Sequence, residues 1–412
     1  MGLVELNGYS STHKLNMKIG ILGAGTAAIV AICEILDTVG NNNFLNLNID
    51  IIYDPTIPTI EVGESLSPPN FVMLKRVLGI ENTKDLRSFQ GTHRYYTKLF
   101  FNDNDKNFSV YYITPGAHLN SQTLSKNALN IILKKYGMVN EVHDKILLVE
   151  QNEESVKVTG NKAFYKYDYV IYCTGSPSEK ELASSEYSPP SIETVNSVIL
   201  YPEFKNFDEN HTSAYMHKNG WMFGVPLPHR KAWGYLYNNK ITSKTEAIEH
   251  FSEIKNIDAS TLRNFSWEPY YRKKVMDGRI LYLGNKLYLF EPHGALPLYY
   301  YANLIKVFNK NVDKMTVENL NFFMNNYHKK HMEAIEDLIA INYYGDVYKD
   351  YDSPFWNYIK PKAYQQLKQS ENWCNWVKKV KKENVMSNYF FHDDIIMDDY
   401  INGYKINLDN FC

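Results

Sequence analysis

The sequence has few cysteines, no long hydrophobic run and no excess of charge of one sign. Its four cysteines, among 412 residues, form no CxxC pair and have no zinc-ligand spacing. We therefore expect reduced thiols, a cytoplasmic protein and no bound metal. No stretch reaches the roughly 18 apolar residues of a membrane-spanning helix. Residues 1–16 lack the apolar core of a signal peptide, so we expect no membrane partner.

The charge balance also excludes a class of partners. Lysine and arginine number 44 and aspartate and glutamate 46, which gives a formal net charge of −2 without a basic tail. A nucleic-acid-binding protein normally carries clustered positive charge, so we expect no nucleic acid. The hydrophobic content of 44% excludes wholesale disorder, and the length suits two or three modules around a large core.

The N-terminal region has the pattern of a β-α-β unit. Residues 17–22 and 49–54 are short apolar runs typical of buried strands, and residues 29–36 have helical periodicity. This unit builds parallel sheets, so the pattern predicts an α/β fold.

A glycine-rich G-x-G-x-x-A motif joins the first of these strands to the helix. Gly23 permits a tight turn, Gly25 lets the backbone approach a pyrophosphate, and Ala28 allows close packing of helix on strand. An acidic residue after the second strand should bind a ribose; Asp54 is the candidate, although Tyr53 competes for the position. The predicted dinucleotide-binding residues are Gly23, Gly25, Thr26, Ala27, Ala28 and Asp54.

Two later segments favour FAD over NAD. Residues 168–175 form an apolar strand that ends in Thr-Gly, and residues 279–285 form another that ends in Gly284 and Asn285. They resemble the second and third motifs of hydroxylase-type FAD-dependent flavoproteins. Such proteins commonly carry aspartate where this sequence has Asn285. The resemblance implies that Gly284 and Asn285 contact the flavin ribityl chain.

Further segments share the pattern of one family. Residues 58–68 contain Val-Gly-Glu, residues 220–227 read Gly-Trp-x-Phe-x-Val-Pro-Leu, and Phe-Glu-Pro occupies residues 290–292. With residues 233–237, 337–344 and 353–356, they make residues 17–360 resemble the flavin-dependent halogenases of the tryptophan halogenase type. Phe223 replaces the second tryptophan of the family pattern. The resemblance adds Val62, Gly63, Glu64, Ser65 and Pro292 to the expected FAD contacts.

The resemblance implies a fold and a reaction. A Rossmann-like FAD module at residues 17–310 would interleave with a substrate-side sheet (about 88–120 and 190–270), and residues 311–412 would be helical. A separate flavin reductase would supply FADH2, which reacts with oxygen to a C4a-hydroperoxide. Halide would attack it to give hypohalous acid, which a lysine and a glutamate direct to a small aromatic substrate.

The catalytic pattern of that family is altered in this sequence. Arg94 occupies the position of the lysine, and guanidinium is a poor nucleophile because it stays protonated. Gly294 occupies the position of the glutamate. The two backbone amides that would bind halide fall at Leu296 and Pro297, and proline has no N–H.

Two residues could compensate for these changes. Lys98 follows Arg94 by four residues, so in a regular strand both side chains share a face about 13 Å apart. His293 stands beside the lost glutamate and could serve as an acid or base. These two residues and Arg94 also have structural interpretations: Lys98 as a solvated sheet residue, His293 as a packing or flavin-adjacent residue, and Arg94 as the partner of a carboxylate.

Other features have simpler interpretations. His328 and His331, near Glu333, most simply lie on a helix surface rather than in a metal site. Trp373 and Trp376 are best explained by core packing, and the acidic patch at His392-Asp-Asp and Asp398-Asp399 by a solvated tail.

Three functions remain open from the sequence. The leading one is an FADH2- and O2-dependent halogenase-like oxidoreductase that acts on an aromatic substrate. The alternatives are a non-halogenating flavin monooxygenase and a flavin-binding member that has lost catalysis. The sequence predicts neither the substrate nor the halide.

Overall fold

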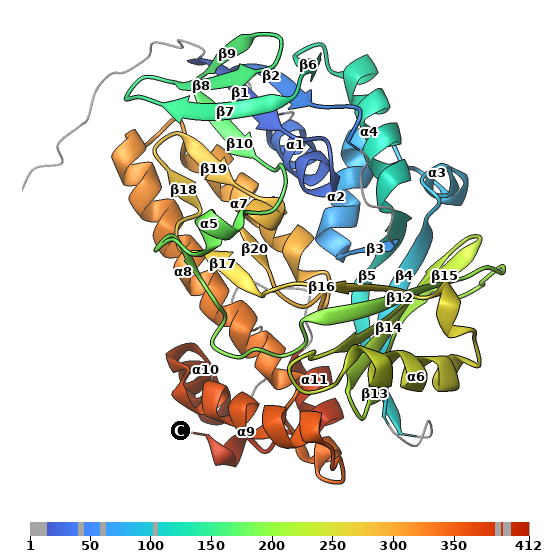
Figure 1. The fold of residues 1–412 in the computed structure, drawn as a ribbon. Helices are drawn as coiled ribbons and strands as arrows, with labels where there is room; N and C mark the ends of the chain where they lie inside the picture. The colour runs from blue at the N-terminus through green and yellow to red at the C-terminus, as the bar shows by residue number, and fades with distance from the viewer. Residues whose placement is uncertain are drawn as a thin grey trace, which may run out of the picture.

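The computed structural model describes residues 15–39, 45–57, 63–101, 106–383, 389 and 397–411. Two large sheets dominate the molecule, and Figure 1 shows them one above the other with the long helix α8 (Val317–Ile341) beside both. Within the described residues, no helix is long and apolar enough to cross a membrane.

The first sheet has six strands in the order β18-β19-β10-β1-β2-β6. Neighbouring strands from β19 to β6 run parallel, as the β-α-β pattern predicts. The predicted strands at 17–22 and 49–54 and the helix at 29–36 are confirmed. The strands are β1 (Leu15–Leu22), β2 (Leu45–Tyr53), β6 (Val139–His143), β10 (Tyr169–Tyr172), β18 (Met276–Asp277) and β19 (Ile280–Tyr282).

Both faces of this sheet are buried, which explains the continuous apolar runs of its strands. Ile21 and Ile51 pack into the main core with the helices, whereas Leu22 and Ile52 pack into a second cluster with a three-stranded sheet. The helices of this part are α1 (Thr26–Val39), α2 (Pro68–Leu78), α3 (Thr83–Ser88), α4 (Ser121–Lys135) and α7 (Leu296–Asn311). The three-stranded sheet consists of β7 (Ile146–Gln151), β8 (Val156–Gly160) and β9 (Phe164–Tyr167).

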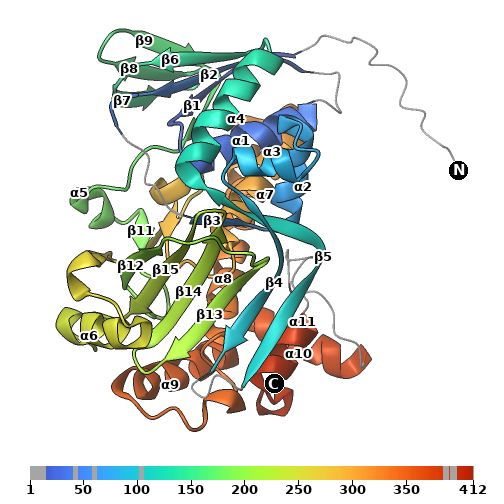
Figure 2. The same ribbon diagram turned by 90° about the vertical axis from the view of Figure 1, so that its right-hand side faces the viewer.

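The second large sheet has eight strands in the order β16-β12-β15-β14-β13-β4-β5-β3. All neighbours are antiparallel except β4 and β13. Helix α6 (Lys244–Lys255) covers one face, as Figure 2 shows. Its buried residues Ala247 and Phe251 pack into a hydrophobic cluster with the sheet. The strands are β3 (Gly63–Leu66), β4 (Thr92–Phe100), β5 (Asn107–Asn120), β12 (Ser197–Glu203), β13 (His211–His217), β14 (Gly220–Leu227), β15 (Arg230–Tyr237) and β16 (Arg263–Ser266).

Short elements connect the two sheets. The strands β11 (Tyr187–Ser188), β17 (Tyr270–Arg272) and β20 (Tyr288–Leu289) form a small sheet of their own. The remaining short helices are α5 (Glu179–Leu182), η1 (Ala259–Thr261), η2 (Gly284–Lys286), η3 (Asp346–Tyr348) and η4 (Leu408–Asn410). The mixed α/β architecture with C-terminal helices confirms the predicted fold class.

The C-terminal part consists of α8, α9 (Pro354–Gln369), α10 (Glu371–Glu383) and α11 (Met397–Tyr404). Asp398 is exposed, as the interpretation of a solvated acidic patch predicts, but Asp398 and the half-buried Asp399 lie in α11, which packs against β5, and not in a tail. Tyr404 is buried there, with its ring against the ring of Phe108. Residues 392–394 lie outside the described residues.

Three minor sequence interpretations have clear outcomes. His328 and His331 are fully buried in α8, so their assignment to a helix surface is wrong. Trp373 and Trp376 are buried and stacked, with ring centroids 5.1 Å apart, which confirms core packing. Cys374 is disulfide-bonded, so the expectation of reduced thiols throughout is wrong, whereas Cys33 and Cys173 are free.

Candidate functional site

The glycine-rich turn lies where β1 ends and α1 begins. Gly23 has φ 105°, a backbone conformation that favours glycine, and its N–H donates to the Ile52 carbonyl at 2.8 Å. A Cβ on Gly25 would meet nothing within 4 Å, so the backbone there borders open space. A pyrophosphate fits this arrangement, because the first turn of α1 directs its N–H groups toward the same space.

The position of this turn in the sheet also suits a nucleotide. From β1 the sheet continues to β2 on one side and to β10 on the other, so the strand order reverses there (Figure 1). Ligands of open α/β sheets bind at the carboxyl ends of the strands next to such a switch point.

The loop after β19 contacts this turn directly. Gly284 has φ 62°, and a Cβ built on it would lie 3.3 Å from the Cβ of Ala27. Asn285, the next residue, is exposed. The third motif is therefore next to the first, with a polar side chain available to a ligand.

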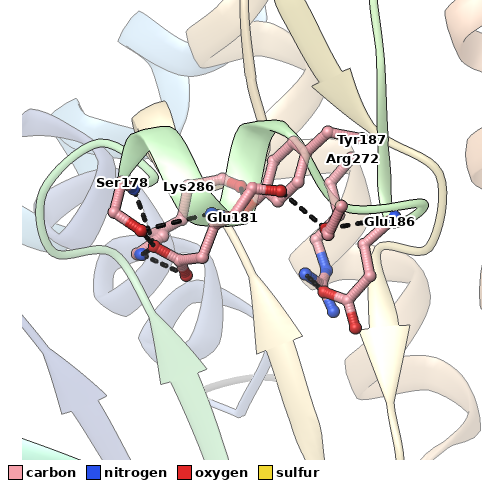
Figure 3. Close-up of polar contacts among 7 residues, drawn as sticks. Ser178, Glu181, Glu186, Tyr187, Arg272 and Lys286 are labelled. Atoms are coloured by element: carbon pink, nitrogen blue, oxygen red, sulfur yellow. Dashed lines mark hydrogen bonds and ion pairs between the residues drawn. The ribbon is translucent and has the colours of Figure 1, made fainter.

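A polar cluster holds that loop in place (Figure 3). Lys286 is 8% exposed, and its Nζ lies 2.8 Å from Oε1 of Glu181. The Tyr187 hydroxyl donates to the Lys286 carbonyl at 2.9 Å. Beside them, Arg272 forms an ion pair with Glu186. Sequence reasoning missed this cluster, although Lys286 directly follows the third motif.

Glu64 connects strand β3 to the same turn. Its carboxylate hydrogen-bonds the Thr26 side chain; burial raises the pKa of Glu64 to about 7, and this hydrogen bond offsets part of the rise. Ser65 follows Glu64 in β3, opposite His118 of β5. Gly63 begins the strand, and Val62 lies outside the described residues.

Asp54 and Tyr53 have different roles at the end of β2. The Tyr53 hydroxyl donates to Glu141 of β6, so this side chain is engaged within the sheet. Asp54 accepts from the N–H of Thr56 at 2.9 Å and from its hydroxyl at 2.6 Å, and these bonds lower the pKa of Asp54. Asp54 remains the candidate for the ribose because its carboxylate is ionised and half-buried.

A small cavity of about 30 Å³ lies between the eight-stranded sheet and the start of α7. Arg94 of β4, Tyr112 of β5, and His293 and Gly294 of the loop before α7 line it together with Tyr400 of α11. The structure thus brings together Arg94 and His293, two of the three predicted catalytic residues. Sequence reasoning missed Tyr112 and Tyr400, and no local pattern marks either residue.

Arg94 is 2% exposed, and only one of its three nitrogens has a hydrogen-bond partner in the described part of the chain. Nη2 donates to the Thr97 hydroxyl at 2.8 Å and to the Tyr112 hydroxyl. Nε and Nη1 are buried and have no hydrogen-bond partner among the described residues. The interpretation of Arg94 as the partner of a carboxylate is wrong, because no ion pair to it occurs within the described part of the chain.

A β-bulge separates Lys98 from this cavity. The register of β4 against β5 shifts between Arg94 and Tyr96, which reverses the alternation of the side chains. Arg94 therefore shares a face with Thr97, whereas the Nζ of Lys98 lies over the ring of Phe100 on the opposite face. The expectation that Lys98 shares the face of Arg94 is wrong.

His293 is held by Asn342 at the end of α8. The Asn342 amide nitrogen lies 2.9 Å from Nε2 of His293 and donates to the Leu338 carbonyl at 2.6 Å, while its oxygen accepts from Tyr404. The imidazole Nε2 is thus an acceptor, and the proton of the neutral ring is on Nδ1. Burial, and then the charge of Arg94, lower the pKa of His293 to about 4.

The start of α7 does not offer the two backbone donors that the family resemblance implies. The Leu296 N–H donates to the His293 carbonyl at 3.1 Å, and Pro297 has no N–H. Gly294 and Ala295 both have φ 61°, a conformation that is costly for alanine. Pro292, which precedes His293, is exposed.

The loop that carries His293 is anchored by a buried acid. Glu291 is 5% exposed, and its Oε2 accepts from the Thr194 hydroxyl at 2.5 Å and the Tyr343 hydroxyl at 2.7 Å. Burial raises the pKa of Glu291 to about 7. Its carbonyl accepts from the His293 N–H at 2.8 Å, so Glu291 fixes the backbone beside the cavity.

The parallel sheet with its glycine-rich turn defines an α/β protein with a Rossmann-like FAD-binding module. The model of the tryptophan halogenase family matches residues 18–122 and 117–396, and the chain belongs to this family. This is the family that the sequence motifs predict.

Individual relatives are distant. Tryptophan 7-halogenase RebH of Lentzea aerocolonigenes is 24% identical over 255 residues, which are 58% of this chain and 46% of that protein. The chain thus matches less than half the length of this curated relative. The tryptophan halogenase of Shewanella frigidimarina NCIMB 400 superposes with a TM-score of 0.79 at 15% identity, covering 96% of this chain and 90% of that one. BrvH, a flavin-dependent halogenase of Brevundimonas sp. BAL3, superposes with a TM-score of 0.76 at 13% identity, covering 94% of this chain and 89% of that one. At these identities the likeness establishes the fold.

Proposed function

We propose that the protein is an FADH2- and O2-dependent halogenase that acts on a small aromatic substrate. The observation that carries the proposal is the placement of Arg94 and His293 in one buried cavity at the start of α7. In the overall reaction, FADH2, O2, a halide ion, a proton and the aromatic compound give FAD, the aryl halide and two water molecules. The reduction of oxygen to water takes four electrons. Bound reduced flavin supplies two of them, and the halide supplies the other two.

The proposed FAD site is the glycine-rich turn with its neighbours. The open space at Gly25 would take the pyrophosphate, and Asp54 would bind the adenosine ribose. The exposed Asn285 and the loop at Gly284 would lie along the ribityl chain. No second nucleotide motif is evident in the sequence, so a separate flavin reductase is the proposed source of FADH2.

Arg94 is proposed to orient hypohalous acid. Its Nε and Nη1 protons are available, and burial among low-polarity side chains strengthens the hydrogen bonds that they make. Because guanidinium stays protonated, Arg94 acts as a donor and not as a nucleophile. With its pKa near 4, His293 is neutral at pH 7 and contributes the Nδ1–H rather than a base.

The size of the cavity limits what it holds. About 30 Å³ accommodates two or so water-sized molecules, so hypohalous acid fits and an aromatic ring does not. Entry of the substrate ring therefore requires a lining element to move. The structure offers α11, which contributes Tyr400 and packs on β5 near the C-terminal end of the described chain.

Mass spectrometry of an indole and phenol panel tests the proposal. The purified protein is incubated with FAD, NADH, a flavin reductase and chloride, bromide or iodide. A halogenated product that requires both the protein and the reductase supports the halogenase. Direct NAD(P)H oxidation by the chain alone would contradict the need for a reductase.

A second candidate is a non-halogenating flavin monooxygenase. The observation that favours it is the loss of the two backbone donors at Leu296 and Pro297. In the same incubations it would give hydroxylated product whose yield does not depend on halide. A member that has lost catalysis would give neither product, and its oxygen uptake would equal that of free reduced flavin.

A further inference from the structure

The cavity beside Arg94 carries a positive charge without an acidic group among its described lining residues. The Arg94 side chain is almost completely buried, and none of the described residues that line the cavity is acidic. A buried cation without a counter-charge loses several kcal/mol of solvation, and the bonds of Nη2 to Thr97 and Tyr112 and the contact with the Tyr112 ring offset only part of this loss. A cation in this position is a strong site for an anion.

The neighbouring groups are donors as well. Nε and Nη1 of Arg94 lack hydrogen-bond partners among the described residues, although they are buried at the cavity wall. Asn342 holds Nε2 of His293 as an acceptor, so the ring carries its proton on Nδ1, the one donor that this lining residue has for an anion. The positive end of the dipole of α7, whose first residue Leu296 also lines the cavity, adds to the same potential.

We propose that this cavity binds a small monovalent anion of the halide class, held by the side chains of Arg94 and His293. The volume of about 30 Å³ suits a monatomic anion and excludes an aromatic carboxylate. Side-chain donors would thus replace the backbone amides that Leu296 and Pro297 do not provide. The inference rests on the proposed function only for the identity of the natural occupant.

Chloride binding to the flavin-free protein tests the inference independently of catalysis. The measurement is the ³⁵Cl NMR line width of dilute chloride, titrated with bromide at constant ionic strength. Wild-type protein should broaden the line in a saturable way that bromide reverses. Arg94→Gln should weaken binding at least tenfold, and Arg94→Lys should keep part of it.

Lys98→Gln is the matched control. It removes the same charge from the same strand, but on the opposite face, so it should bind chloride as wild type does. Equal broadening by Arg94→Gln and wild type would overturn the inference, and so would equal losses in both variants. Circular dichroism establishes that each variant is folded.

A crystallographic measurement avoids variants altogether. Wild-type crystals soaked in bromide should give an anomalous peak within hydrogen-bond distance of the Arg94 guanidinium. A cavity without bromide at saturating concentration would overturn the inference. Anion binding without halogenated product would refute the proposed function alone, whereas product without anion binding would refute this inference alone.

Discussion

The amide nitrogen of Asn342 lies 2.9 Å from Nε2 of His293 and sets the protonation of that ring. Asn342 cannot be reversed without placing its oxygen against the Leu338 carbonyl and losing the bond from Tyr404. A residue that could serve as an acid or base by sequence is therefore a neutral donor in the structure. The hydrogen bond from Tyr404 also couples α11 to the cavity.

The His293 ring should titrate differently when Arg94 is replaced. Burial and the guanidinium charge both lower the pKa of His293, to about 4. In Arg94→Gln the second cause is absent, so the pKa should rise by up to about one unit yet stay below the ordinary 6.5. Long-range ¹H–¹⁵N NMR of histidine rings measures both values. An unchanged pKa would show that the two side chains do not interact.

The two glycines of the turn should respond differently to substitution. A side chain on Gly25 points into open space, so Gly25→Leu should leave the melting temperature almost unchanged and abolish FAD binding by occupying the pyrophosphate position. Gly23→Ala should destabilise the protein by about 1–2 kcal/mol, because φ is 105° and the Thr174 methyl group lies 3.0 Å from the new Cβ. FAD fluorescence quenching and thermal unfolding measure the two effects. Micromolar FAD binding by Gly25→Leu would refute the assigned site.

The two partners of the Glu181–Lys286 ion pair should not be equivalent. Lys286 is buried, whereas the side chain of Glu181 is 44% exposed. Glu181→Ala leaves a buried charge unpaired and should cost roughly 2 kcal/mol, but Lys286→Met leaves an exposed carboxylate and should cost less. Chemical denaturation gives the ranking. A larger loss for Lys286→Met would show that packing, not pairing, dominates.

Glu291 should make stability fall as pH rises. Its carboxyl has a pKa of 4.5 as an ordinary group and about 7 in the fold, so between these values the folded state binds more protons than the unfolded state. The unfolding free energy should decrease over this range, by at most roughly 3 kcal/mol from this group. Glu291→Gln should gain stability relative to wild type between pH 5 and pH 8. A difference that is the same at both pH values would contradict the buried, proton-binding carboxyl.

Sequence reasoning succeeded where local patterns determine structure. The strand, turn and helix at residues 17–36 depend on near neighbours, and so does the loop at Gly284, whose φ of 62° favours glycine. Pattern alone therefore predicts the glycine-rich turn and the α/β fold.

Contacts between residues that are far apart in the sequence determine the features that local patterns do not predict. The bulge after Arg94 arises from the register of β4 against β5, so the sequence of β4 alone predicts the wrong face for Lys98. Tyr400 joins the cavity from the far end of the chain, and Asn342 reaches His293 from α8. The burial of His328 likewise depends on partners outside its helix, the Tyr300 hydroxyl and the Arg272 carbonyl.

Halogenated product from Arg94 variants is the most direct test of the central claim that Arg94 directs an electrophilic halogen to an aromatic substrate. Product is measured by mass spectrometry with FAD, reductase and each halide, for wild type, Arg94→Gln, Lys98→Gln and the double variant Arg94→Lys with Gly294→Glu. The account predicts product from wild type and Lys98→Gln, with at least a hundredfold loss in Arg94→Gln despite unchanged FAD binding. Product from the double variant alone, or undiminished product from Arg94→Gln, would contradict it.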